Sequence, residues 1–323
     1  MYPKYYIGPM TKNVVDAIIE FCDETNNNIG LIPSRRQVEF DGGYVNNWKT
    51  KDFTEYVNGK LLIKRDHSGP GQGYTDDDGF TSLREDCKYL NMIHIDPWKK
   101  YPKYKDGLIW TIKMIEYCWG INQQMEFEIG TEQAIRRFEP EELNLLIKDI
   151  QSNLDSKIFN QIKYLVIQSG TSLNGNSNTG DYDKDRLVSM ISIAKKYNLL
   201  SKEHNGDYIP VNLIKEKMGL GLDSINIAPE FGQIETKTFI HRIKKEKPEL
   251  LGSLYKICYI SNKWKKWVDG DFNPIKQKEE LINICGHYVL SDSNFLLMIK
   301  SNFPDIDLEI KNNIKEKLNE LFT

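Results

Sequence analysis

The residues best suited to chemistry are an aspartate and a histidine that stand side by side. Asp66 and His67 end a short, largely apolar run and precede a sharp turn through Gly and Pro. A carboxylate is suited to proton transfer, and an imidazole is suited to metal binding or proton transfer. A further histidine, His204, ends another such run far along the chain. The sequence therefore predicts a site assembled from distant segments.

Other ionisable residues alternate along apolar runs. His94 alternates with Asp96, and Glu126 alternates with Glu128, so each pair shares one face of an extended segment. Charges on a buried strand are costly unless they are paired or bound to a metal. Histidines and carboxylates that converge from different strands are ligands that Zn²⁺ accepts. The alternative is a hydrogen-bonded polar layer without a metal.

Short apolar runs recur along the chain about every thirty residues, and nearly every run ends in polar residues or glycine. The run ends are Met10, Pro33, Asp66, Asp96, Gly130, Gln168, His204 and Ala228. Each interval can hold a strand, a loop and a crossover helix, so the pattern predicts a (β/α)8 TIM barrel. Active sites of such barrels lie at the C-terminal ends of the strands. The run ends are therefore where the chemistry is expected.

The segments between the runs are predicted to be helical. Thr11 is suited to cap the first helix, and apolar residues recur at helical spacing in the later ones. The ranges are 109–119, 141–150, 185–197 and 211–218. Two long polar loops, 68–82 and 170–183, interrupt the pattern, and strand-like runs stop after Phe231. We predict a barrel over residues 1–250 and a helical C-terminal extension, packed on the barrel, over 251–323.

Composition narrows the function classes. A net charge of −3 and a pI near 6.0 give no reason to expect nucleic acid, and the basic, aromatic tract 99–105 is better explained as a solvated loop. No run of eighteen apolar residues predicts a membrane span, and no signal peptide is evident. The five cysteines are scattered and form no C-x-x-C pair. They predict reduced thiols in a cytoplasmic protein.

Several of these run ends, taken in order, carry a resemblance to a known family. The similar segments are Gln37-Val38 with Gly42-Gly43-Tyr44, Asp66-His67 with Gly69-Pro70, Ile93-His94-Ile95-Asp96, Glu126 with Ile129-Gly130-Thr131-Glu132, Leu165-Val166-Ile167-Gln168 with Gly170, His204 with Asp207-Tyr208, and Ala228-Pro229. Together they resemble the Z-type subunits of class II tagatose-bisphosphate aldolases. They are more distantly similar to the zinc-dependent class II fructose-bisphosphate aldolases.

The resemblance implies roles for four residues. Asp66 would transfer a proton and His67 would bind the metal, as the Asp-His pair does in class II aldolases. His204, at the end of the seventh run, would be another metal ligand. Glu132, in the loop after the glutamate-bearing strand, would be an acid/base group. The cofactor implied is a divalent metal, Zn²⁺ in the first instance.

The chain departs from the family at other positions. The zinc aldolases carry a further histidine where this chain has Gln168, whose amide oxygen would have to serve as a weaker ligand. Glu128, or its neighbour Glu126, would supply a second metal site or support the first. The phosphate-binding residues of the family have only partial counterparts in Asn205 and Asn226, which are predicted to contact substrate.

Arg35 and Arg36, at the end of the second run, offer a replacement site for an anion. A guanidinium binds phosphate or carboxylate through two parallel hydrogen bonds. Gln37 directly follows them and is assigned to substrate binding with them. The alternative for the arginines is a surface salt bridge.

The functional hypothesis is a metal-dependent, class II aldolase-like carbon-carbon lyase that acts on a ketose or ketose phosphate. One alternative is a metal-dependent sugar epimerase that uses the same retro-aldol step. The other, implied by the Z-type resemblance, is a non-catalytic subunit that stabilises a separate aldolase. The expected partners are a small sugar or sugar phosphate and, at the protein level, either a second copy of the chain or that aldolase subunit.

Overall fold

The computed structural model, which describes residues 1–268 and 270–323, contains a closed barrel of eight parallel strands. The strands are β1 (Tyr5–Ile7), β2 (Ile29–Leu31), β3 (Leu62–Ser68), β4 (Met92–Ile95), β5 (Glu126–Ile129), β6 (Ile162–Ile167), β9 (Leu200–Glu203) and β10 (Ser224–Ile227). They follow one another around the ring in chain order, and β10 pairs with β1 to close it. The predicted TIM barrel is confirmed, with every strand at a predicted apolar run.

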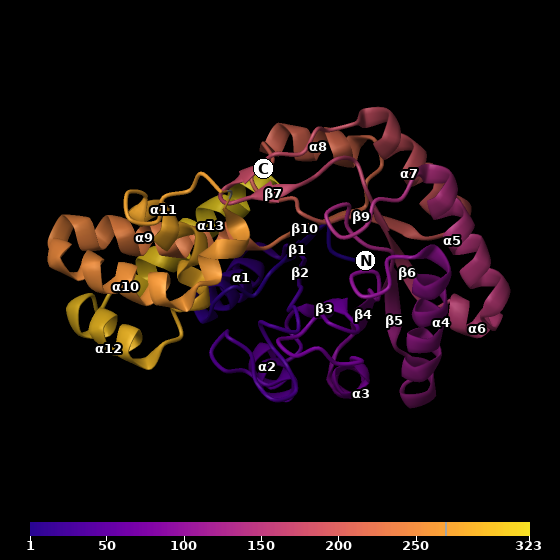
Figure 1. Ribbon diagram of the computed structural model, residues 1–323, viewed down its shortest axis with the longest axis horizontal. Helices are drawn as coiled ribbons and strands as arrows, with labels where there is room; N and C mark the ends of the chain where they lie inside the picture. The colour runs from indigo at the N-terminus through magenta and orange to yellow at the C-terminus, as the bar shows by residue number, and fades with distance from the viewer. Residues whose placement is uncertain (269) are drawn as a thin grey trace.

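Helices cross over between the strands on the outside of the barrel (Figure 1). They are α1 (Lys12–Thr25), α2 (Thr50–Val57), α3 (Phe80–Tyr89), α4 (Tyr104–Ile121), α5 (Pro140–Asn153), α6 (Ser156–Phe159), α7 (Lys184–Lys196), α8 (Val211–Gly219) and α9 (Pro229–Glu246). The four helical ranges predicted after the first lie in α4, α5, α7 and α8, apart from the last residue of 185–197. Thr11 caps α1 as predicted, because its hydroxyl accepts a hydrogen bond from Val14 N at 3.2 Å.

The two long loops differ in structure. The loop after β3 has no regular element before α3, and Gly69 and Gly71 both adopt positive φ in it. The loop after β6 folds into a two-stranded antiparallel hairpin, β7 (Leu173–Asn174) with β8 (Ser177–Asn178). Both loops leave the C-terminal ends of strands, where they can surround a site.

The chain after α9 is helical and lies to one side of the barrel, next to α1 (Figure 1). Its elements are η1 (Pro248–Leu250), α10 (Leu251–Ser261), η2 (Lys263–Trp267), α11 (Lys278–Cys285), η3 (Gly286–Tyr288), α12 (Ser293–Asn302) and α13 (Ile306–Phe322). The last helix returns to the barrel: Tyr5 Oη donates to Leu321 O at 2.8 Å, and Phe322 packs on Tyr5 and Phe21. These helices share one hydrophobic core with β1, β2 and α1. The division at residue 250 stays a prediction.

A layer of charged residues fills the interior of the barrel. Lys64 Nζ lies 2.7 Å from Glu128 Oε1, and Lys202 Nζ lies 3.1 Å from Glu128 Oε2. Lys202 Nζ also lies 3.1 Å from the ring centroid of Tyr6. Burial alone would raise the pKa of Glu128, but Lys202 and Lys64 hold it well below its usual value. The layer therefore holds an ionised carboxylate between two lysine side chains, and burial lowers the pKa of Lys202 well below its usual value.

Across residues 1–268 and 270–323, no helix combines the length and the apolar character needed to cross a membrane. All five cysteines are free thiols.

Candidate metal centre and active site

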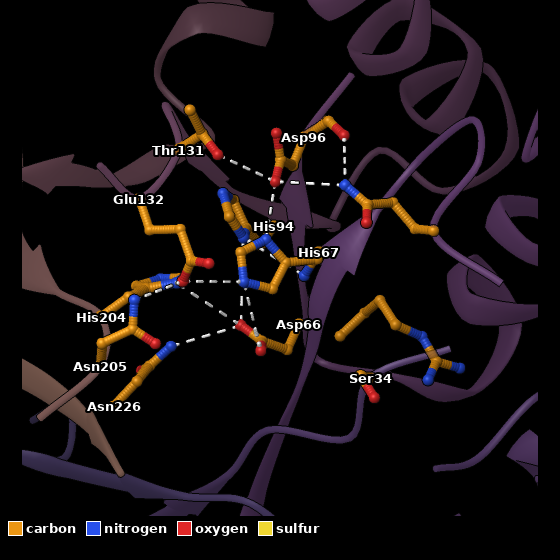
Figure 2. Close-up of polar contacts among 12 residues, drawn as sticks. Ser34, Asp66, His67, His94, Asp96, Thr131, Glu132, His204, Asn205 and Asn226 are labelled. Carbon is orange, nitrogen blue, oxygen red and sulfur yellow. Dashed lines mark hydrogen bonds and ion pairs between the residues drawn. The ribbon is translucent and has the colours of Figure 1, made fainter. Parts of the chain in front are cut away.

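Three histidines and an aspartate meet at the C-terminal mouth of the barrel (Figure 2). His67 lies near the end of β3, His94 in β4 and His204 directly after β9. With Asp66, they offer ligand atoms that all lie within 4.8 Å of one another. Strands from different parts of the chain thus bring the predicted Asp66, His67 and His204 to one place.

The backbone at His67 explains how two adjacent side chains reach the same site. Neighbouring residues of a regular strand point to opposite faces. The pairing of β3 with β4 shifts register between Arg65 and Ser68, and His67 has a φ of 44°, in the left-handed region. Such a conformation costs about 1–3 kcal/mol in a residue other than glycine and is concentrated at functional sites. It places His67 Nε2 at 3.7 Å from Asp66 Oδ2.

The ring of His94 is oriented by a backbone carbonyl. Its Nε2 lies 3.0 Å from Gly130 O, and because a carbonyl can only accept, Nε2 carries the proton. Nδ1 is then unprotonated: it accepts from His67 N at 3.3 Å and lies 4.0 Å from Asp66 Oδ1. Burial lowers the pKa of His94 well below its usual value. This histidine is neutral, as a metal ligand must be.

Carboxylates orient the other two rings. Asp96 Oδ2 accepts from His67 Nδ1 at 2.6 Å and is itself held by Thr131 Oγ1 at 3.1 Å. Glu128 Oε1 accepts from His204 Nε2 at 2.8 Å. The nitrogens left to face the cluster are His67 Nε2 and His204 Nδ1. A second hydrogen bond of this kind is the usual support of a metal-binding histidine.

The donor set fits a divalent transition metal. Three imidazole nitrogens and one carboxylate are the ligand types of Zn²⁺, and tetrahedral ligands about 2.0–2.1 Å from one ion lie about 3.4 Å apart. The ring nitrogens of His67, His94 and His204 lie 3.7, 4.0 and 3.9 Å from the nearer oxygen of Asp66. The ligand atoms of the cluster all lie within 4.8 Å of one another, so the three rings and Asp66 surround one point.

Glu132 lies at the same mouth. Its Oε2 is 3.5 Å from His67 Nε2 and accepts from Asn205 Nδ2 at 2.9 Å. Burial would raise the pKa of Glu132, but His67 and His204 hold it below its usual value. Asn226 Nδ2 donates to Asp66 Oδ1 at 3.3 Å. Asn205 and Asn226, predicted to contact substrate, therefore contact the two carboxylates predicted to transfer protons.

Gln168 is placed away from the cluster. Its Oε1 accepts from Phe138 N at 2.9 Å, and its Nε2 donates to Thr131 O and Arg136 O at 2.8 Å each. The amide is thus engaged by backbone groups, which argues against the predicted role as a ligand. His94 brings the third ring nitrogen to the cluster. The sequence signal for it is its place near a predicted strand end, in the segment Ile93-His94-Ile95-Asp96, to which the resemblance assigned no metal role.

Of the two roles predicted for Glu128, its contacts agree with support and argue against metal binding. Its Oε1 accepts from His204 Nε2, it is paired with Lys64 and Lys202, and it is not among the residues of the cluster.

The neighbouring arginines have different environments. Arg35 is buried and makes two hydrogen bonds to Asp77, at 2.9 and 2.6 Å, and one to Glu39 at 2.6 Å. It is committed to internal ion pairs, which argues against the predicted role in anion binding. Arg36 lines a cavity of about 320 Å³ above the cluster, together with Gln37. The predicted substrate roles of these two remain compatible with their positions.

The same cavity is lined by both the barrel and the C-terminal helices. Barrel residues include Asp66, His67 and Glu132, whereas Lys266 and Trp267 come from η2. The cavity therefore connects the histidine cluster to the C-terminal extension.

No protein-family model matches this chain, and no curated protein sequence matches it either. Its fold is shared with solved structures. A probable tagatose 6 phosphate kinase from Sinorhizobium meliloti 1021 is 15% identical, with 99% of each chain covered and a TM-score of 0.76. Fructuronate-tagaturonate epimerase UxaE from Cohnella laeviribosi is 11% identical over 99% of this chain and 81% of its own, with a TM-score of 0.66.

A fructose-bisphosphate aldolase from Campylobacter jejuni is 10% identical over 99% of this chain and 90% of its own, with a TM-score of 0.59. At these identities the similarity concerns the fold alone. The chain thus has the barrel fold found in an aldolase and an epimerase of sugars. For the Sinorhizobium protein, the coverage shows that the similarity includes the C-terminal helices.

Proposed function

We propose that the chain is a metal-dependent enzyme that cleaves or forms a carbon-carbon bond in a ketose by aldol chemistry. The observation that carries the proposal is the cluster itself: three oriented imidazoles and Asp66, of which His67 and Asp66 line a cavity together with Glu132. A divalent ion held by His67, His94 and His204 would supply Lewis-acid polarisation of a ketone oxygen. The remaining roles belong to the side chains of the protein.

Asp66 is positioned to take the proton from the hydroxyl at the bond that breaks. As that oxygen becomes a carbonyl, the electron pair of the carbon-carbon bond passes to the ketone-bearing fragment. Glu132, oriented by Asn205, is positioned to return a proton to the carbon that receives the pair. Asn226 fixes Asp66 through its hydrogen bond to Oδ1.

A sugar epimerase is the second candidate, because the same retro-aldol step followed by rotation of one fragment would use the same residues. The observation that favours this candidate is the fold that the chain shares with the epimerase UxaE. A non-catalytic stabilising subunit is the third candidate. The open cavity and the oriented nitrogens weigh against it, since an interface needs neither.

The deciding experiment is elemental analysis of the purified full chain, prepared without chelator, followed by product analysis with ketoses and ketose phosphates. We expect about one divalent metal per chain. Two smaller carbonyl products would identify an aldolase, and a single isomeric sugar would identify an epimerase. Absence of metal, with no activity restored by Zn²⁺, Mn²⁺ or Co²⁺, would favour the stabilising subunit.

Asp66→Asn tests the role of the carboxylate. The amide keeps the shape and loses the proton-transfer group, so turnover should fall by about 100-fold or more while bound metal stays near one per chain. Loss of the metal in this variant would instead make Asp66 a fourth ligand. Normal turnover would remove it from the mechanism.

A further inference from the structure

Three cations line the cavity above the histidine cluster. They are Arg36, Lys99 and Lys266. Within residues 1–268 and 270–323, no carboxylate lies within ion-pair distance of any of them. Arg35 differs from these three, because its guanidinium donates hydrogen bonds to the carboxylates of Asp77 and Glu39. Unpaired cations around a cavity are available to an anion from solution.

Neutral contacts hold the three cations in place. Arg36 Nε donates to Gly73 O at 3.2 Å, and Lys99 Nζ donates to Gly71 O at 3.2 Å. Lys266 Nζ lies 4.4 Å from the ring centroid of Trp267. Backbone carbonyls and an aromatic ring orient the groups but do not neutralise their charge.

The cations are close enough to repel one another. Burial and then Arg36 lower the pKa of Lys99. Burial, Arg36, Lys263 and Lys99 lower the pKa of Lys266 to about 7. An anion bound among them would relieve this repulsion and favour the charged form of each lysine.

Asp66, His67 and Glu132 line the cavity at the cluster, so the positive charge that attracts an anion lies with Arg36, Lys99 and Lys266. A substrate with one anionic group would therefore be oriented, with its uncharged oxygens toward the histidines. The volume of about 320 Å³ is at the lower end of the range for small-molecule sites.

We propose that Arg36, Lys99 and Lys266 form a phosphate-binding subsite that orients a phosphorylated ketose in this cavity. The proposal rests on the proposed function only in naming a ketose as the rest of the ligand. A phosphate monoester carries about −1.5 to −2 charges near pH 7, which matches three cations better than the single charge of a carboxylate. Its three terminal oxygens can accept from side chains that approach from different directions.

The subsite gives the C-terminal extension a role in binding. Arg36 follows β2 and Lys99 follows β4, but Lys266 belongs to η2, between α10 and α11. The barrel alone would provide only two of the three cations.

The test is calorimetric binding of inorganic phosphate to the full chain after removal of metal, so that no metal-phosphate contact contributes. We expect binding that weakens as NaCl is added. Lys266→Met should weaken it roughly tenfold, because it removes one charge-assisted hydrogen bond while preserving the length of the side chain. Lys265→Met is the matched control: its ammonium lies near the ring of Trp264 and does not line the cavity, so phosphate binding should be unchanged.

Further measurements separate this proposal from the proposed function. His94→Ala should keep phosphate binding even though it should lose the metal, and Lys266→Met should keep its metal content. Wild-type protein that binds no phosphate at millimolar concentration, or equal affinity in the wild type and Lys266→Met, would reject the subsite. A hexuronate that competes more strongly than a hexose phosphate would reject phosphate as its ligand, whatever the result of the metal analysis.

Discussion

Two groups of ionisable residues lie along the barrel axis, and they differ in the interaction partners of their polar atoms. In the deep layer, Glu128 is held between Lys64 and Lys202, and all three side chains are fully buried. At the mouth, His67 and His204 each have one nitrogen bound to a carboxylate and one facing the cluster, whereas His94 Nδ1 faces the cluster and accepts from His67 N.

Glu128 connects the two groups, because it also accepts from His204. The difference teaches that polarity inside a barrel does not by itself indicate a functional site. A deep layer in which protein charges compensate one another is a structural feature. A cluster whose donor atoms face one point beside an open cavity is suited to bind a ligand.

The largest effect should come from His94, which only the structure brings into the proposed ligand set. His94→Ala should weaken metal affinity by more than about 100-fold, because even residues that merely orient a ligand are worth about 10–100-fold. Turnover should be lost with the metal. Metal titration of the purified variant checks this.

Gln168→Ala is the matched comparison. It should retain the metal and lose about 1–3 kcal/mol of unfolding free energy, because buried backbone groups lose their partners. If Gln168→Ala lost the metal and His94→Ala kept it, the assignment of the third nitrogen would be wrong.

A smaller effect, on stability, should follow from breaking the deep layer. Lys202→Met leaves Glu128 with Lys64 as its lysine partner, and removal of one partner of a buried ion pair typically costs about 3–5 kcal/mol. Urea unfolding at neutral pH should show this loss, with the metal still bound at saturating Zn²⁺. Lys163→Met, on the more exposed side of β6, is the control and should change stability by less than about 0.5 kcal/mol. Equal stability of both variants would show that Lys202 is not needed to balance Glu128.

The smallest effect concerns the buried carboxylate of Glu235 in α9. Within residues 1–268 and 270–323 its hydrogen-bond partners are the neutral Thr11 Oγ1 and Asn13 Nδ2, and burial, with the nearby Asp307 and Asp16, raises its pKa to about 7. Because the folded-state pKa is raised, its stabilising contribution is complete below about pH 4.5 and is lost as pH rises through 7. The loss amounts to at most about 3 kcal/mol.

Glu235→Gln imitates the protonated acid at every pH. Relative to wild type, this variant should therefore become more stable between pH 5 and pH 8, as measured by urea unfolding at intervals across that range. A difference between the two proteins that does not change with pH would show that Glu235 titrates normally.

The barrel could be predicted from the sequence because its signal is local. Each strand buried on both faces needs a short apolar run, and each crossover needs enough residues for a helix. The regular spacing of the apolar runs can therefore be recognised in the sequence without knowledge of tertiary contacts. The same argument placed Asp66, His67 and His204 at one mouth, since parallel strands in a ring present their C-terminal ends together. Glu132 was assigned only through the family resemblance. The capping of α1 by Thr11 was equally local.

The partners of each polar side chain were decided by the tertiary structure. The left-handed backbone at His67 and the register shift of β3 let adjacent side chains share one site. Gln168 is engaged by the backbone of a loop after β5, and Arg35 is neutralised by Asp77 whereas Arg36 remains available. These outcomes depend on distances between segments remote in sequence. Periodicity records which face of a strand or helix is buried, but it does not record which donor meets which acceptor.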